Sequence, residues 1–120
     1  MPKKNLLLVL SNAVEGKEDE FNDWYSNVHL HDGVKVPGFV AAQRYQLSDV
    51  QREGAPPSRW IYLTVWEIDA DDPTEALAET KRRLRTPQMP IRDDTITDIW
   101  SYVFEPITPR VEPKAADKTS

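Results

Sequence analysis

The most constraining feature of the sequence is residues 59–69, RWIYLTVWEID, a stretch rich in aromatic and β-branched residues. This composition predicts a β-strand. Successive side chains of a strand point to opposite faces of its sheet, which gives one face Trp60, Tyr62, Thr64, Trp66 and Ile68, and the other Ile61, Leu63, Val65 and Glu67. Both faces are largely apolar, as are those of a second predicted strand, residues 5–11 (NLLLVLS). A sheet built from these strands needs cover on both sides.

The order of the predicted elements indicates how this cover arises. The predicted order is βαββαβ, with strands at 5–11, 39–48, 59–69 and 95–105 and helices at 18–33 and 73–85. This order predicts a ferredoxin-like α+β fold, with two helices on one face of an antiparallel four-stranded sheet. The other face would be bare and apolar, which is a liability in solution. We therefore expect a homodimer that packs two bare faces into a closed barrel. Residues 1–105 would form this single domain, followed by a polar, proline-containing tail at 106–120.

Two of these elements carry specific expectations about side-chain direction. Alternation along residues 39–48 places on one face Phe39, Ala41, Gln43, Tyr45 and Leu47, and on the other Val40, Ala42, Arg44, Gln46 and Ser48. The helix at 73–85 would begin with Asp72 as N-cap, Pro73 at its first position and Glu75 in a capping box. Its inward face would be Ala76, Leu77, Thr80 and Leu84.

The helix at 18–33 brings ionisable groups to the edge of the core. A rotation of about 100° per residue aligns Phe21, Trp24, Tyr25, Val28 and Asp32 on one face, with His29 and His31 flanking it on opposite sides. An apolar stripe normally faces the core. Polar groups at its end are costly unless they are paired or line a solvated cavity. This pattern marks the helix end as a candidate site.

These segments resemble the dimeric α+β barrel superfamily, through DEFNDWYSNVH, VPGFVAAQRYQL and RWIYLTVWEID. More narrowly, the chain is similar to EthD-like proteins, whose first helix carries F-x-x-W/Y-Y-x-x-x-H-x-P before a P-G-F strand entry. The matching residues, within a similarity that covers about residues 5–105, are Phe21, Trp24, Tyr25, His29 and residues 37–39. The proline usual two positions after the histidine is His31 here. The superfamily includes lactone isomerases, polyketide cyclases, small monooxygenases, haem-degrading enzymes and many proteins without known activity, so the resemblance implies a pocket more firmly than a reaction.

The candidate catalytic residues are His29, Tyr25 and Asp32. His29 is suited to general acid or base chemistry, because its ordinary pKa lies near neutrality; it could instead bond a backbone carbonyl. Tyr25 lies one helical turn earlier and could donate to a substrate oxygen, or be a core tyrosine with its hydroxyl at the rim. Asp32 could orient His29 or anchor the helix end. We expect His31 to lie on the surface or to anchor a loop.

The candidate substrate-binding residues are mainly aromatic. Trp24, Trp66, Trp100 and Tyr62 could line an aromatic pocket, or serve in the core or the dimer contact. Arg44, in a strand beside aromatic residues, could bind a carboxylate. His29 and His31 are two residues apart, which separates them around a helix, so we expect no metal site.

The composition of the chain limits which partners, cofactors and cell compartment we expect for it. The net charge of −5 and the pI of about 5.0 argue against nucleic acid and anionic membranes as partners. The chain has no cysteine, phosphate loop or dinucleotide-binding glycine pattern, and residues 6–10 are too short for a membrane span. These features predict a cytoplasmic protein without a cofactor.

The leading functional hypothesis is a cofactor-independent lyase, isomerase or cyclase acting on a small aromatic or polyketide-like molecule. The substrate would lie between the helices and the sheet, with His29 moving a proton. Two alternatives stay open: a non-catalytic small-molecule binding or accessory protein, and a haem-degrading or cofactor-less monooxygenase.

Overall fold

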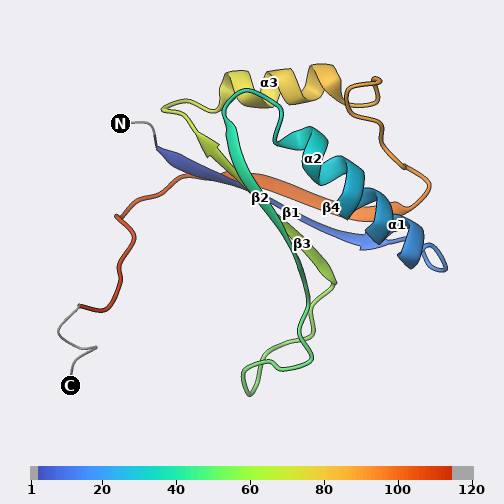
Figure 1. Cartoon of the computed structure of the whole chain (residues 1–120). Coiled ribbons are helices and arrows are strands. Elements are labelled where there is room, and N and C mark those ends of the chain that lie inside the picture. The colour runs from blue at the N-terminus through green and yellow to red at the C-terminus, as the bar shows by residue number, and fades with distance from the viewer. Residues whose placement is uncertain (1–2, 115–120) are drawn as a thin grey trace.

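The computed structural model describes residues 3–114 and has the predicted ferredoxin-like α+β architecture (Figure 1). Its elements are β1 (Lys4–Ala13), α1 (Glu18–Trp24), a π-helical turn η1 (Tyr25–His29), α2 (Leu30–Gly33), β2 (Phe39–Gln46), β3 (Tyr62–Asp69), α3 (Thr74–Arg83) and β4 (Ile96–Phe104). The strands form one antiparallel sheet in the order β2-β3-β1-β4. All helices lie on one face of it (Figure 1). The predicted fold class is therefore confirmed.

The first helix is not the regular helix that the sequence predicted. In η1 the backbone N–H of Leu30 donates to the carbonyl of Tyr25, five residues earlier. A π-turn holds one extra residue and so rotates the following side chains by about one position. Val28, expected to face the core, is 39% exposed, and His29 takes the inward position. Gly33 is likewise buried where Asp32 was expected.

The end of this helix lies unusually close to the sheet. A Cβ atom at Gly33 would overlap the Trp66 ring. Only glycine therefore allows α2 to pack this tightly on β3. This contact depends on the π-turn, because the rotation that it introduces turns Gly33 towards the sheet.

A bulge changes the expected faces of β2. Phe39 pairs with Ile68, but Ala41 pairs with Glu67, so Val40 is an extra residue in the ladder. Beyond this bulge the alternation is inverted. Arg44 pairs with Thr64 and shares the helix-covered face with Phe39, whereas the sequence had placed the two on opposite faces.

The helix-covered face holds the core of the molecule. Its buried side chains are Phe21, Trp24, Tyr25, Val36, Phe39, Trp66, Ile68, Ala76 and Met89. Within residues 3–114 nothing covers the other face (Figure 1). Leu6, Leu8 and Leu10 pair there with Phe104, Tyr102 and Trp100. Tyr102 is 57% exposed and Phe104 47%, so the bare apolar face that the sequence indicated is present in the single chain.

Helix α3 begins at Thr74, one residue later than expected, with Pro73 rather than Asp72 as its N-cap and without the capping box. The Asp72 carboxylate accepts hydrogen bonds from the backbone N–H and the hydroxyl of Thr74, at 2.9 and 2.6 Å. Glu75 instead pairs with Arg82 at 2.6 Å. The residues that follow β4, 105–114, form neither helix nor strand. The last part of the predicted tail, 115–120, lies outside the described residues.

Candidate functional site

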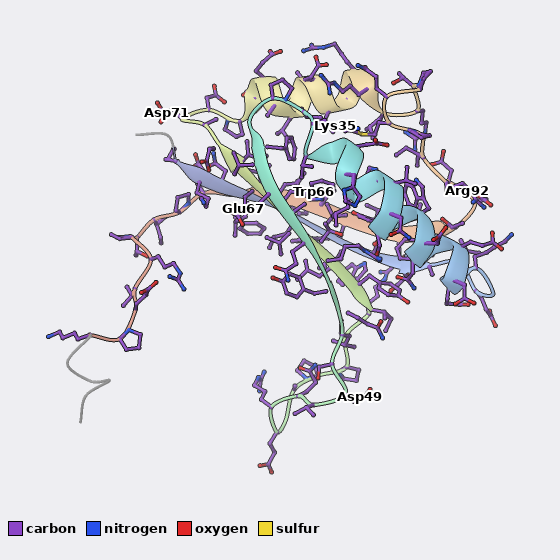
Figure 2. All side chains as sticks on the ribbon, viewed as in Figure 1. Lys35, Asp49, Trp66, Glu67, Asp71 and Arg92 are labelled. Carbon is purple, nitrogen blue, oxygen red and sulfur yellow. The ribbon has the colours of Figure 1, made fainter. Side chains whose placement is uncertain are left out.

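A cavity of about 240 Å³ lies between the first helix, the sheet and the loop after α3. The π-turn contributes Tyr25 and His29, and β3 contributes Trp66, which Figure 2 shows in the layer between sheet and helices. The loop after α3 closes one side with Met89, which is fully buried, and Ile91. Most of the wall is apolar, so this cavity suits a small apolar molecule.

His29 is surrounded by aromatic rings in this wall. Its ring stacks on Trp24, with centroids 5.0 Å apart and planes at 22°. The edge-on neighbours are Tyr25 at 4.9 Å and Trp66 at 5.7 Å. The imidazole is therefore held in a fixed orientation by three rings, one of which packs parallel to it.

This environment lowers the basicity of His29 and leaves it without a partner. Burial lowers the pKa of its imidazole to about 4, an effect that the charge of Asp32 opposes and that of Arg44 reinforces. His29 is consequently neutral at pH 7. Its Nδ1 atom is buried and has no hydrogen-bond partner within residues 3–114. The expected alternative, a bond to a backbone carbonyl through this atom, is not formed.

The other two candidate catalytic residues are placed differently. Tyr25 lines the cavity but is only 2% exposed. Burial raises the pKa of its hydroxyl, opposed by polar contacts with Thr64 and Trp66. It therefore keeps its proton at neutral pH. Asp32 does not line the cavity and acts on His29 only through its charge, and His31 is exposed.

The aromatic candidates divide between the two faces of the sheet. Trp24 and Trp66 line the cavity, and the Trp24 indole donates to the Pro90 carbonyl at 3.1 Å. Trp100 lies on the bare face, with its ring 4.6 Å from that of Tyr102. It is therefore not part of this cavity and lies instead on the face expected to make the dimer contact, which was the alternative left open for it. The reason is the strand alternation of β4, which directs Ser101 rather than Trp100 towards the helices.

Arg44 and Tyr62 also lie apart from His29. Both line a second, smaller pocket together with Asn22. Tyr25 packs between the two pockets, with its ring 4.9 Å from that of His29 and 4.6 Å from the Arg44 guanidinium carbon.

Two charged residues at the cavity were not among the candidate site residues. Arg85 and Asp93 line it and bind each other through two hydrogen bonds of 2.7 and 3.0 Å. Arg85 adopts a left-handed backbone conformation (φ 63°) just after α3. Their meeting depends on the path of the loop, which no local pattern encodes.

Two structural observations concern metal ions and membranes. Among residues 3–114, no three His, Asp or Glu side chains lie close enough together to hold a metal ion. None of the helices in that range is long and apolar enough to cross a membrane.

Comparison with known proteins supports the fold. No protein-family model matches the chain, and no curated protein matches it. A solved structure from Bacillus cereus, described as a "putative antibiotic biosynthesis monooxygenase", superposes with a TM-score of 0.51. The match covers 92% of this chain and 99% of that one, at 13% sequence identity. This chain is therefore similar in fold to that protein.

Proposed function

We propose that the helix–sheet cavity binds a small aromatic or polyketide-like molecule and that His29 accepts a proton from it. The reaction would be a cofactor-independent isomerisation, lyase reaction or cyclisation. The observation that carries this proposal is the buried, unpartnered Nδ1 of His29 in an otherwise mostly apolar wall.

In the tautomer that carries its proton on Nε2, the unpartnered Nδ1 is an acceptor and favours a ligand that can donate to it. Leaving such a group without a hydrogen bond costs about 1–3 kcal/mol. A phenol or enol hydroxyl that reaches Nδ1 on a small shift of the surrounding rings would supply the missing donor, while the apolar walls would hold its ring. The cavity and His29 are thus complementary to a molecule that is apolar except for one acidic X–H group.

The neutral imidazole is in the correct state to act as a base. Proton transfer from an acidic C–H or O–H group to Nδ1 would give an imidazolium, and the return of that proton to another atom of the substrate would complete an isomerisation. The charge of Asp32 and the stacked Trp24 ring would stabilise the cation. Tyr25 would act by holding the imidazole edge-on.

Two other functions use the same cavity. A non-catalytic binding protein is favoured by the low basicity of His29 and by the mutual pairing of Arg85 and Asp93, which engages the two charged groups of the wall. A cofactor-less monooxygenase is favoured by the similarity in fold to the Bacillus cereus protein, which is described as a monooxygenase. A substrate deprotonated by His29 would be electron-rich, as reaction with dioxygen requires. Absorption spectra with and without added haem test the haem-degrading variant of this alternative.

The proton-transfer proposal is testable with 2-tetralone, a small bicyclic ketone with acidic hydrogens next to its carbonyl. In deuterated buffer, NMR measures the exchange of these hydrogens, and protein-observed titration measures binding. We expect the wild-type protein to bind the ketone and accelerate exchange. His29→Asn should slow exchange per folded molecule by roughly 100- to 10,000-fold and change affinity far less. His31→Asn, which alters the exposed histidine of the same helix, is the matched control and should behave as wild type.

The outcomes separate the candidate functions. Binding without accelerated exchange by the wild-type protein would contradict proton transfer and favour the non-catalytic role. Accelerated exchange that survives in His29→Asn would remove His29 from the reaction.

A further inference from the structure

A polar pocket of about 190 Å³ opens on the side of Tyr25 away from His29. It is lined by Asn22, Arg44, Tyr45, Gln46 and Tyr62. These residues come from α1, from the end of β2 and from the start of β3. The pocket therefore differs from the His29 cavity in both position and polarity.

Arg44 is held in the wall of this pocket by three aromatic rings and one hydrogen bond. Its guanidinium carbon lies 4.6 Å from the centroid of the Tyr25 ring, 5.2 Å from that of Phe21 and 5.5 Å from that of Tyr62. One terminal nitrogen donates to the Ser26 hydroxyl at 2.7 Å. The Nε atom is buried and has no partner within residues 3–114. The aromatic neighbours fix the plane of the guanidinium without neutralising its charge.

No carboxylate neutralises Arg44 in the part of the chain that the structure describes. Six of the eight arginines are ion-paired, namely Arg59, Arg82, Arg83, Arg85, Arg92 and Arg110. Of the other two, Arg52 lies in the exposed loop between β2 and β3, where water solvates it. Arg44 alone combines partial burial with the lack of an acidic partner, a costly arrangement for a charge.

One neighbouring polar group, the Tyr62 hydroxyl, presents a second donor. The Asn22 amide donates to the Glu18 carbonyl at 3.0 Å and to the Tyr62 hydroxyl at 3.2 Å. Because the Tyr62 oxygen accepts this bond, its own hydrogen is free to donate. Two donors, the Arg44 guanidinium and the Tyr62 hydroxyl, thus meet at one pocket.

We propose that this pocket binds a small aromatic carboxylate, with Arg44 as its anchor and Tyr62 as a second donor. Arginine matches the planar, two-oxygen geometry of a carboxylate. The anion would supply the negative charge that the described chain does not place there. The Tyr62 ring, which lines the pocket beside the guanidinium, offers an apolar surface to an attached ring. This second site goes beyond the function proposed for His29, because Tyr25 separates the two pockets.

Binding of benzoate and of benzamide, its neutral analogue of similar shape, tests this site. Isothermal titration and amide chemical shifts of Ser26 and Tyr62 would follow both ligands. We expect benzoate to saturate the wild-type protein and benzamide to bind at least about tenfold more weakly, the difference that one or two charge-assisted bonds make. Arg44→Gln should weaken benzoate binding by a similar factor. Arg52→Gln, which removes the other unpaired arginine, should leave it within about twofold of wild type.

Additional variants keep the test decisive if Arg44→Gln unfolds. Tyr62→Phe removes one donor and keeps the ring, and we expect a few-fold loss of benzoate affinity. His29→Asn should bind benzoate as wild type does, which separates this site from the proposed catalytic one. Equal affinity for benzoate and benzamide, or full benzoate affinity in a folded Arg44→Gln, would overturn the proposal. Tighter binding of inorganic phosphate than of benzoate would contradict the assignment to a carboxylate.

Discussion

Acidification should destabilise this protein through His29. In the unfolded chain the imidazole takes up its proton near pH 6.5, whereas in the folded protein burial lowers its pKa to about 4. Between these two values the unfolded state binds more protons, so the free energy of unfolding falls as the pH falls. The loss begins near pH 6.5 and levels off below about pH 4.

The magnitude follows from the separation of the two pKa values. Each pH unit of separation corresponds to about 1.36 kcal/mol. Between pH 7.5 and 4.5, a pKa of about 4 in the folded state gives a loss of about 2.5 kcal/mol from this one group. Carboxylates also titrate in this range, but they do so equally in matched variants, so a comparison isolates the histidine.

The assay is urea denaturation of wild type, His29→Asn and His31→Asn at both pH values. We expect the wild-type protein to lose about 2.5 kcal/mol more than His29→Asn. His31→Asn retains His29 and should follow the wild type. The same pH dependence in wild type and His29→Asn would show that the imidazole is solvated or paired, and would refute the reasoning that makes it an unpartnered acceptor.

Three further predictions concern the fold. We propose that the chain forms a homodimer through the bare sheet face, which exposes Tyr102. Sedimentation at micromolar concentration should show a dimer, and Tyr102→Lys should shift it to monomer. A monomeric wild-type protein would contradict the proposal. Gly33→Ala should lower the free energy of unfolding by about 1–3 kcal/mol, because its methyl group would overlap Trp66; unchanged stability in urea would mean that the helix end does not lie against the sheet. Deleting residues 110–120 should shift the melting temperature by less than about 4 °C, since Ile107 and Val111 just before and within this segment are 96% and 86% exposed; a larger drop would indicate a structural arm.

The architecture could be predicted from the sequence because the hydrophobic periodicity of each segment identifies it as a strand or a helix. The order of these elements then gives the fold class. The strand at Tyr62–Asp69 has the expected faces, with Thr64, Trp66 and Ile68 buried. The expected core stripe of Phe21, Trp24 and Tyr25 is also buried. These features depend on the period of a strand or a helix and require no knowledge of tertiary contacts.

The site was predicted less well because two backbone irregularities change which face of the helix or the strand the following residues occupy. The π-turn exchanges Val28 for His29 in the core, and the bulge at Val40 moves Arg44 to the helix-covered face. Each inserts one residue, and periodicity alone cannot locate such an insertion. Gly33 could have given a signal, since a glycine at the end of an apolar stripe can mark close approach to a neighbour. The Arg85–Asp93 pair depends on a loop path and had no such signal.

The most direct test of the proposed site is the nitrogen NMR spectrum of the His29 imidazole during titration with 1-naphthol, a bicyclic phenol. Its hydroxyl can donate to the unpartnered Nδ1, whereas 1-methoxynaphthalene has a similar shape but no donor. We expect 1-naphthol to shift the Nδ1 resonance of His29, and the methoxy compound to shift the Trp24 and Trp66 indole signals without that change. Binding of 1-naphthol that leaves the His29 nitrogens unaltered, or an equal response to both compounds, would contradict the assignment of His29 as the ligand-contacting base.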